Sequence, residues 1–197
     1  MQLQKLIVAT GNLHKLREIR GIFWETEVIS AAEAGFEEDT PETGGTFEEN
    51  ALIKARAASR ALGLPALADD SGLCVDALGG APGVYSARYA GGHGNDKANR
   101  EKLLRELSDI ANRRARFRCA VALCFPGGKE IIATGETCGE ILREEQGKNG
   151  FGYDCLFFSD DLQKSFAEAT AEEKNAVSHR GRALSALKEK LARLREE

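Results

Sequence analysis

Short apolar runs alternate with segments of helical periodicity along most of the chain. The first run, residues 6–9, predicts a buried strand, and apolar residues at helical spacing predict a helix over residues 15–24. A second strand is expected over residues 26–29, before a long acidic loop over residues 35–46. The chain therefore opens with a strand, a polar loop and a helix, which is typical of an α/β domain.

Turn and cap signals delimit the next elements. Thr46 and Glu49 have capping-box spacing, in which each side chain bonds the other's backbone, and they predict a helix from Phe47 to Leu62. Residues 66–68 and 73–75 are predicted strands on either side of a turn at residues 69–72. A glycine-rich loop is expected over residues 79–94.

The second half of the chain continues the alternation. We predict a helix over residues 96–110, a hairpin of strands 117–125 and 130–134, and a strand over 156–158. A second capping box, Thr170 with Glu173, begins a short helix, and Ser178 is expected to cap the last one. The whole chain, residues 1–197, is predicted to form one α/β domain with a mixed sheet, which the hairpin could divide into two lobes. The apolar stripe of the last helix comprises Leu184, Leu187, Leu191 and Leu194.

Composition narrows the function classes. A net charge of −4 argues against a general nucleic-acid partner. The five cysteines lack CxxC spacing, which argues against zinc and favours reduced, mostly buried thiols. Without a signal peptide or an apolar run long enough to span a membrane, we expect a cytoplasmic protein with no membrane partner. A basic run, Arg113 to Arg118, is interpreted as the solvated face of a strand.

The common nucleotide-binding loops, GxxxxGK[ST] and GxGxxG, do not occur. A first candidate phosphate site is the loop Thr10-Gly11-Asn12-Leu13-His14-Lys15, which joins the first strand to a helix. Backbone N–H groups at a helix N-terminus attract anions, and Lys15 adds a positive charge there. A plain loop with a solvated lysine is an equally good interpretation of this segment alone.

A second candidate is Asp69-Asp70-Ser71-Gly72. Two adjacent carboxylates repel each other, and Mg²⁺, which prefers a few oxygen ligands completed by water and phosphate, would relieve that repulsion. Neighbouring strand residues point to opposite sides, so one aspartate is expected to be the direct ligand, with Glu42 as a possible second. A turn with exposed acids explains the tetrapeptide equally well.

Two further segments, and Lys54 on the helix after the first capping box, carry polar or aromatic groups suited to a nucleotide. In Gly150-Phe151-Gly152-Tyr153-Asp154, an exposed Phe151 could stack on a base and Asp154 could accept its hydrogen bonds. In Ser178-His179-Arg180, the guanidinium of Arg180 could donate to a carbonyl or a phosphate. Taken alone, Phe151 could equally be a core residue, and Arg180 and Lys54 are better explained as surface residues.

Taken together, these segments resemble the inosine triphosphate pyrophosphatase family, enzymes that remove non-standard purine nucleoside triphosphates. The matching segments follow in family order over nearly the whole chain, so the set is far more specific than any one motif. They are Thr10-Gly11-Asn12 with Lys15, Glu42-Thr43-Gly44, Thr46-Phe47 with Glu49-Asn50-Ala51 and Lys54-Ala55, Ala68-Asp69-Asp70-Ser71-Gly72-Leu73, residues 79–91, residues 150–154, and Glu173-Lys174 with Ser178-His179-Arg180.

The resemblance implies a single domain with a long, twisted mixed sheet flanked by helices, and two lobes around a central cleft. It implies a homodimer, Mg²⁺, and hydrolysis of ITP, dITP or XTP between the α and β phosphates. It also implies a role for each matching residue: Thr10, Gly11, Asn12, Leu13, His14, Lys15, Lys54 and Lys174 on the triphosphate; Glu42 and Asp70 on the metal; Asp70, helped by Asp69, on the attacking water; and Ser71, Phe151, Gly152, Tyr153, Asp154, His179 and Arg180 on the base.

Small departures and two alternatives accompany this interpretation. Cys155 stands where the family usually has a proline, which could loosen the loop of Phe151 and Asp154, and residues 91–94 are unusually rich in glycine. The alternatives are a pyrophosphatase for modified pyrimidine triphosphates and a non-catalytic module that binds nucleotides or RNA.

Selection of the purine base is expected to depend on hydrogen-bond donors at His179 and Arg180, from backbone or side chain. These donors would face the carbonyl at position 6 of ITP or XTP, where ATP has an amine.

Overall fold

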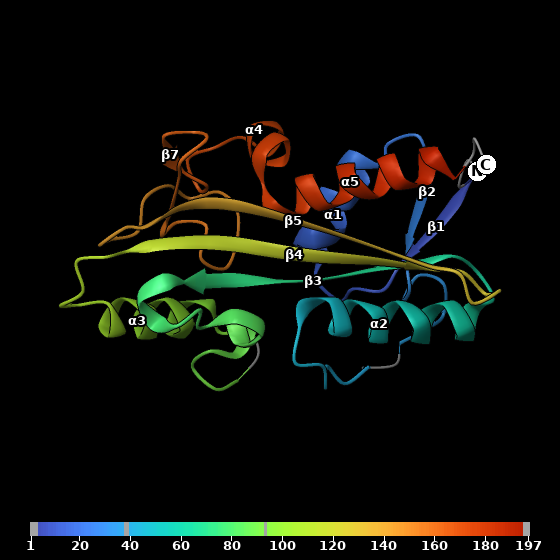
Figure 1. Ribbon diagram of the computed structural model, residues 1–197, viewed down its shortest axis with the longest axis horizontal. Helices are drawn as coiled ribbons and strands as arrows, with labels where there is room; N and C mark the ends of the chain where they lie inside the picture. The colour runs from blue at the N-terminus through green and yellow to red at the C-terminus, as the bar shows by residue number, and fades with distance from the viewer. Residues whose placement is uncertain (1–3, 38–39, 93, 195–197) are drawn as a thin grey trace. The chain divides into compact units, whose positions relative to one another are not determined.

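A seven-stranded mixed sheet organises the computed structural model, which describes residues 4–37, 40–92 and 94–194 (Figure 1). Its strand order is β2-β1-β3-β4-β5-β6-β7. Strand β1 pairs in parallel with β2 and β3, whereas β6 pairs antiparallel with β5 and β7. The strands are β1 (Lys5–Val8), β2 (Glu27–Ser30), β3 (Ala66–Val75), β4 (Arg114–Cys124), β5 (Glu130–Ile141), β6 (Phe157–Ser159) and β7 (Lys164–Ser165).

Helices alternate with these strands, so the predicted α/β class with a mixed sheet is confirmed. One short 3₁₀ helix lies in the predicted glycine-rich loop, and another directly precedes it. The helices are α1 (Leu13–Ile22), α2 (Phe47–Leu62), η1 (Asp76–Leu78), η2 (Gly83–Arg88), α3 (Asp96–Glu106), α4 (Ala171–Val177) and α5 (His179–Arg193).

Helix α2 has the bounds that its cap signals predict. Thr46 Oγ1 accepts from the backbone N–H of Glu49 at 3.1 Å, and Gly63 ends the helix with a left-handed φ of 63°. The expected reciprocal bond is wrong, however, because the Glu49 carboxylate accepts from the N–H of Gly45 at 2.7 Å instead. The second box, at Thr170 and Glu173, is complete.

Strand β3 corrects the predicted turn. Residues 69–72 do not leave the sheet; they are the middle of one ten-residue strand that is mostly buried. Charged partners from α1, α2 and α5, described below, compensate the buried acids, so tertiary contacts override the turn preference of this tetrapeptide. Helix α1 also begins two residues earlier than predicted, and α3 ends at Glu106 instead of residue 110.

The chain forms two compact units, of which unit 1 comprises the residues up to Asp70, Cys119–Gly135, and those from Arg180 onward. Within unit 1, α2 covers one face of the sheet, and α1 and α5 cover the other (Figure 1). On the α2 side small residues such as Ala58 and Ala66 pack with Ile7. On the opposite side Leu6, Val8, Leu16, Ile19, Leu67, Val121, Leu184 and Leu187 form the main core.

Unit 2 comprises Ser71–Arg118 and Glu136–His179 and has its own core. The ring of Phe117 lies 4.7 Å from that of Phe157 and 6.1 Å from that of Phe166, centroid to centroid. Leu103 of α3 and Leu107, which follows the last residue of that helix, pack into the same cluster. A single domain over residues 1–197 and a cleft between two lobes stay predictions.

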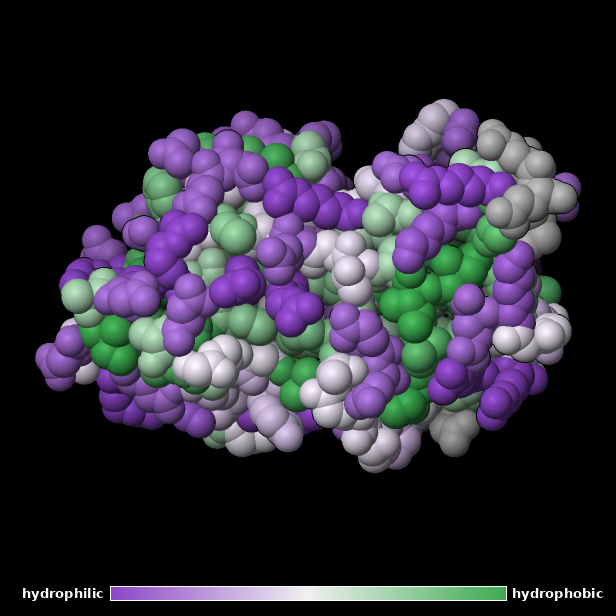
Figure 2. Space-filling model, in the orientation of Figure 1, coloured by the Kyte–Doolittle hydropathy of each residue, from purple (hydrophilic) through white to green (hydrophobic). Residues whose placement is uncertain are grey.

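The cysteines and the surface differ in part from expectation. Cys119 and Cys124 are buried, Cys74 and Cys155 are half-buried, and Cys138 is exposed, so the prediction of mostly buried thiols holds for only some of them. None of the described helices is both long enough and apolar enough to span a membrane. In the view of Figure 2, hydrophilic residues cover much of the face, and apolar residues are exposed in the part of unit 1 between α2 and α5.

Candidate active site

Asp69 and Asp70 are buried side by side in β3, with 1% and 5% of their surface exposed. Their carboxylates bind different partners, as the alternation of a strand predicts. Asp69 contacts Lys15 and Arg180, whose helices α1 and α5 lie on one face of the sheet. Asp70 contacts Asn50 of α2, on the other face.

The Asp69 side of the strand is a buried ion-pair network. Oδ2 of Asp69 lies 3.0 Å from Lys15 Nζ, and it accepts from Arg180 Nε at 3.1 Å and Nη2 at 3.0 Å. The remaining terminal nitrogen of Arg180, Nη1, donates to Glu18 of α1. Burial alone would raise the pKa of Asp69, but the charges of Lys15, Arg180 and Lys54 outweigh it and lower the pKa far below 3.8. Asp69 is therefore ionised throughout the physiological range.

At Asp70, burial has a larger effect on the pKa than the neighbouring positive charges, which is the reverse of Asp69. Burial raises the pKa of Asp70 above 3.8, and the nearby Glu42 adds to this effect, while Lys54 and Lys15 oppose it. Lys54 Nζ lies 3.8 Å from Oδ1 of Asp70 and donates to Glu42 and to the backbone carbonyl of Asp69, both at 2.7 Å. A carboxylate with a raised pKa is a stronger base, so Asp70 suits proton abstraction better than Asp69 does.

Asn50 connects Asp70 to the acidic loop, and sequence reasoning assigned it no role. Its Nδ2 donates to Asp70 Oδ2 at 3.0 Å, and its Oδ1 accepts from the N–H of Gly44 at 2.8 Å. A Cβ on Gly44 would lie 2.6 Å from Glu49 Cβ and 2.8 Å from Asn50 Oδ1, so only glycine allows this approach. The available signal was an asparagine on the mostly apolar buried face of α2.

Glu18 was also missed. It lies one turn after Lys15 on α1, and its side chain is 13% exposed where it meets Arg180. An acid three residues after a candidate phosphate lysine, on the same side of the helix, was the available sequence signal.

The Thr10–Lys15 segment differs from a simple anion loop. Asn12 Oδ1 accepts from the N–H groups of His14 at 2.9 Å and Lys15 at 3.2 Å, and Thr10 Oγ1 accepts from the N–H of Asn12 at 3.1 Å. Side-chain caps thus use N–H groups that were expected to face a phosphate. Leu13 and His14 have exposed side chains, Gly11 is exposed at the preceding turn, and Lys15 is the side chain that reaches the acids of β3.

The predicted metal ligands fit a hydrated divalent ion. The carboxylates of Glu42 and Asp70 both lie near the ammonium group of Lys54, so the two acids share one region of the site. Within the described part of the chain, no group of three or more His, Cys, Asp or Glu side chains is arranged to hold a metal. Two carboxylates match Mg²⁺, which commonly takes one or two protein carboxylates and completes its shell with water and substrate phosphates.

In unit 2, the loop at residues 150–154 surrounds a buried lysine. Asp154 Oδ2 accepts from Lys174 Nζ at 2.7 Å and from the N–H of Phe151 at 2.8 Å. Lys174 Nζ also lies 4.8 Å from the centre of the Phe151 ring, and only 5% of the residue is exposed. Gly150 has a φ of 76°, and a Cβ there would overlap the Asp154 carboxylate. The half-buried Phe151 ring, Lys174 and Asp154 thus form one unit.

Several predicted base contacts have mainly structural surroundings. The side chain of Tyr153 lies in the core of unit 2, and its hydroxyl donates to the carbonyl of Ser86 at 2.9 Å. The ring of His179 stacks on Phe117 at 4.8 Å between centroids. Ser71 follows Asp70 in β3 and is half-buried. The expectation of solvated surface positions was wrong for Arg180 and Lys54, which are buried or nearly so.

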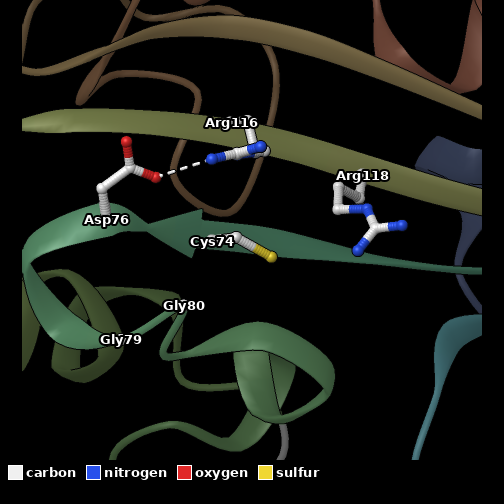
Figure 3. A pocket seen from close by; sticks show the side chains of 6 residues that line it. All are labelled: Cys74, Asp76, Gly79, Gly80, Arg116 and Arg118. Carbon is white, nitrogen blue, oxygen red and sulfur yellow. Dashed lines mark hydrogen bonds and ion pairs between the residues drawn. The ribbon is translucent and has the colours of Figure 1, made fainter.

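The basic run is only partly a solvated strand face. Arg114, Arg116 and Arg118 alternate with buried residues in β4, as predicted. Arg113 is instead buried and donates to the carbonyls of Leu107, Ile141 and Leu142 at 2.6–2.9 Å. A hollow of about 350 Å³ in unit 2 lies beside this strand, and none of the predicted site residues lines it (Figure 3). Its lining comprises Cys74, Asp76, Gly79, Gly80, Arg116 and Arg118, with Arg116 bonded to Asp76 at 2.9 Å.

Comparison with known proteins identifies the family. The model of the Ham1 family matches residues 6–190. The chain belongs to the Ham1 family. A relative from Haemophilus influenzae, named dITP/XTP pyrophosphatase, is 55% identical over 194 residues that cover 95% of this chain and 99% of the relative.

Solved structures of Ham1 proteins have the same fold. The structure of a HAM1 protein from Coxiella burnetii is 44% identical, covers 98% of this chain and 100% of its own, and superposes with a TM-score of 0.87. The structure of the Ham1 protein from Staphylococcus aureus is 42% identical, covers 95% of this chain and 98% of its own, and has a TM-score of 0.86. The family and fold that the ordered motifs predict are therefore confirmed.

Proposed function

We propose that this member of the Ham1 family hydrolyses deaminated purine nucleoside triphosphates, dITP, XTP and ITP, to the monophosphate and pyrophosphate. One observation carries the chemical part of the proposal: two adjacent buried acids with opposite pKa shifts lie among Lys15, Lys54 and Arg180. Relatives named dITP/XTP pyrophosphatase, about half identical over nearly the whole chain, support the substrate class.

Asp70 is the proposed base for the attacking water. Its raised pKa makes it a better proton acceptor than an ordinary aspartate, and Asn50 fixes one of its oxygens. The water transfers a proton to Asp70 as its oxygen bonds to phosphorus, and the bond to the leaving pyrophosphate breaks. Asp69, held ionised by Lys15 and Arg180, keeps those cations in place near the reacting groups.

Cations and a metal are proposed to hold the triphosphate. Lys15 and Lys54 would neutralise phosphate charge, together with Lys174 and the turn from Thr10 to Asn12. Glu42 and Asp70 would hold Mg²⁺, which when bound stabilises the negative charge that develops on the phosphates. Because Lys54 bonds Glu42 at 2.7 Å, it would have to share that carboxylate with the ion.

The base is proposed to contact Ser71, the loop from Phe151 to Asp154, His179 and Arg180. A donor facing position 6 of the purine accepts the carbonyl of ITP or XTP and opposes the amine of ATP. The Arg180 guanidinium pairs with Asp69 and Glu18, which favours the backbone alternative for its contact with the base.

The proposal also includes a homodimer in the cytoplasm, where nucleotide pools are maintained. Exposed large apolar side chains, including Trp24 at 75% and Tyr85 at 59%, are compatible with burial against a second copy. Light scattering coupled to gel filtration should give twice the 21.3 kDa mass of the chain, and a monomer mass would refute the dimer.

Pyrophosphate release tests the function directly. We expect rapid, chelator-sensitive release from dITP and XTP, and little from dATP or dGTP measured in parallel. Release mainly from modified pyrimidine triphosphates would favour the pyrimidine alternative, and binding without release from any triphosphate would favour the non-catalytic one.

A further inference from the structure

Helix α3 of unit 2 holds one residue of the 150–154 loop by both of its backbone groups. The carboxylate of Asp96 accepts from the N–H of Gly152 at 2.9 Å. The guanidinium of Arg100 donates to the carbonyl of Gly152 at 3.0 Å. Asp96 and Arg100 are four residues apart on α3, so they lie on the same side of the helix and reach the same peptide segment.

Gly152 is the residue directly after Phe151, so these two bonds control the backbone that carries the aromatic ring. Gly152 has a φ of 61°, a conformation that other residues rarely adopt. The rest of the loop is held from elsewhere, by Lys174 on Asp154 and by Ser86 on Tyr153. Phe151 itself donates its N–H to Asp154 at 2.8 Å, within the loop, and the contacts from α3 hold the next residue from outside the loop.

Each α3 residue also has an ordinary structural role, which a test must separate. Asp96 is an acid in the first turn of α3, where its negative charge interacts favourably with the helix dipole. Arg100 bonds Glu145 at 2.6 Å, in a pair whose Glu145 side chain is 47% exposed. Exposed ion pairs contribute little to stability, and neither role gives a reason for a change in substrate affinity.

We propose that Asp96 and Arg100 are positioning residues that clamp Gly152 and thereby set the Phe151 ring for the purine base. This inference rests on the proposed function, in which Phe151 stacks on that base. The clamp adds two charge-assisted hydrogen bonds to a loop that has no regular secondary structure of its own. Both residues act through Gly152, so their loss should weaken binding of the base more than the hydrolytic step.

Matched variants separate the clamp from the other roles. Asp96→Asn keeps an oxygen acceptor for the Gly152 N–H, whereas Asp96→Ala removes it. Arg100→Ala removes the donor to the Gly152 carbonyl. Glu145→Ala removes the exposed ion pair but leaves the contact between Arg100 and Gly152, and it is therefore the control for Arg100→Ala.

The first readout is steady-state hydrolysis of dITP. We expect Asp96→Ala and Arg100→Ala each to raise KM by roughly tenfold or more, the range for a lost hydrogen bond to a charged group, with kcat changed by less than about threefold. Asp96→Asn and Glu145→Ala should stay close to the wild type. The double alanine variant should raise KM by less than the product of the single effects, because both bonds hold the same residue. Equal effects of Glu145→Ala and Arg100→Ala would overturn the proposal.

The second readout needs no substrate. Hydrogen exchange measured by mass spectrometry on peptides that contain residues 150–154 should be faster in Asp96→Ala than in the wild type or Glu145→Ala. Unchanged exchange would refute the clamp, whatever the enzyme hydrolyses. Faster exchange with an unchanged KM for dITP would refute the link to the base. A wild type that does not hydrolyse dITP would overturn the proposed function and that link together, while the exchange data would still decide the clamp.

Discussion

Replacing Asp69 by asparagine should destabilise the folded chain much more than the same change at Asp70, although the two residues are neighbours in β3. Asp69 is the shared counter-charge of Lys15 and Arg180, of which Arg180 is almost fully buried at 1% exposure. Asp70 is an acid whose ionisation the fold opposes, because burial raises its pKa. An amide at Asp70 removes a buried charge and keeps an oxygen that can accept from Asn50.

The size of the Asp69 effect follows from the charges left behind. Removing one partner of a buried ion pair costs ~3–5 kcal/mol, because the other charge remains desolvated. For a chain of this length, each kcal/mol lowers the melting temperature by roughly 2–4 °C, so Asp69→Asn should lower it by roughly 6–20 °C. Asp70→Asn should leave the melting temperature unchanged or raise it, while lowering turnover of dITP by orders of magnitude.

The pH dependence has a defined sign. A lowered pKa stabilises the folded state above the ordinary value of 3.8, and that contribution is lost as the pH falls below it. A raised pKa has the opposite effect, so ionised Asp70 costs stability above 3.8. The stability gap between Asp69→Asn and Asp70→Asn should be full at pH 7 and shrink below about pH 4.

Thermal unfolding followed by far-ultraviolet circular dichroism, in chelator and without substrate, measures the gap without any contribution from bound metal. Urea unfolding at pH 7 provides the free energies. Equal melting temperatures for the two variants would refute the reasoning, and so would a lower value for Asp70→Asn than for Asp69→Asn.

Three further experiments test separate parts of the structure. Asn50→Ala should lower the apparent Mg²⁺ affinity or kcat by roughly 10–100-fold, because the Asn50 amide orients Asp70. Activity measured against Mg²⁺ concentration checks this, and a curve identical to that of the wild type would contradict it. Gly150→Ala should cost ~1–3 kcal/mol of unfolding free energy, because Gly150 has a positive φ and a Cβ there would overlap the Asp154 carboxylate. Gly127→Ala, in an open turn, should cost less, and equal costs would contradict this account. At pH 8, a thiol reagent should label exposed Cys138 first, because burial raises the pKa of Cys119 to about 12 and of Cys124 to about 11. Peptide mass spectrometry identifies the labelled cysteine. Early labelling of Cys119 or Cys124 would show that the core opens.

The parts of the fold that depend on local signals could be predicted from the sequence. Helix α2 has its expected bounds because Thr46 and Gly63 cap it within the chain itself. Both ends of strand β3 could be predicted, but its continuity could not. Asp69 and Asp70 are turn-formers by local preference and stay in the sheet only through Lys15, Asn50 and Arg180. Those partners come from three different helices, and their meeting point is a property of the tertiary fold.

The candidate site divides along the same line. Ordered motifs pointed to Lys15, Asp70 and Lys174 because each belongs to a short segment with a recognisable pattern. Asp96 and Arg100 belong to no such pattern, since each is one more charged residue on a strongly polar helix. Only the folded structure distinguishes a charged residue that faces water from one that holds the backbone of a distant loop.

The chain passes between its two units repeatedly: it enters unit 2 at Ser71, returns at Cys119, enters again at Glu136 and returns at Arg180. Cleavage of the chain at one position therefore cannot separate the two units. Neither unit is a continuous segment that could be transferred to another protein. Strands β3, β4 and β5 each contribute residues to both units, so breaking one strand should weaken both cores. A protein of this connectivity is expected to unfold in one cooperative step. For the same reason, recombination between genes could transfer the whole chain but neither unit alone.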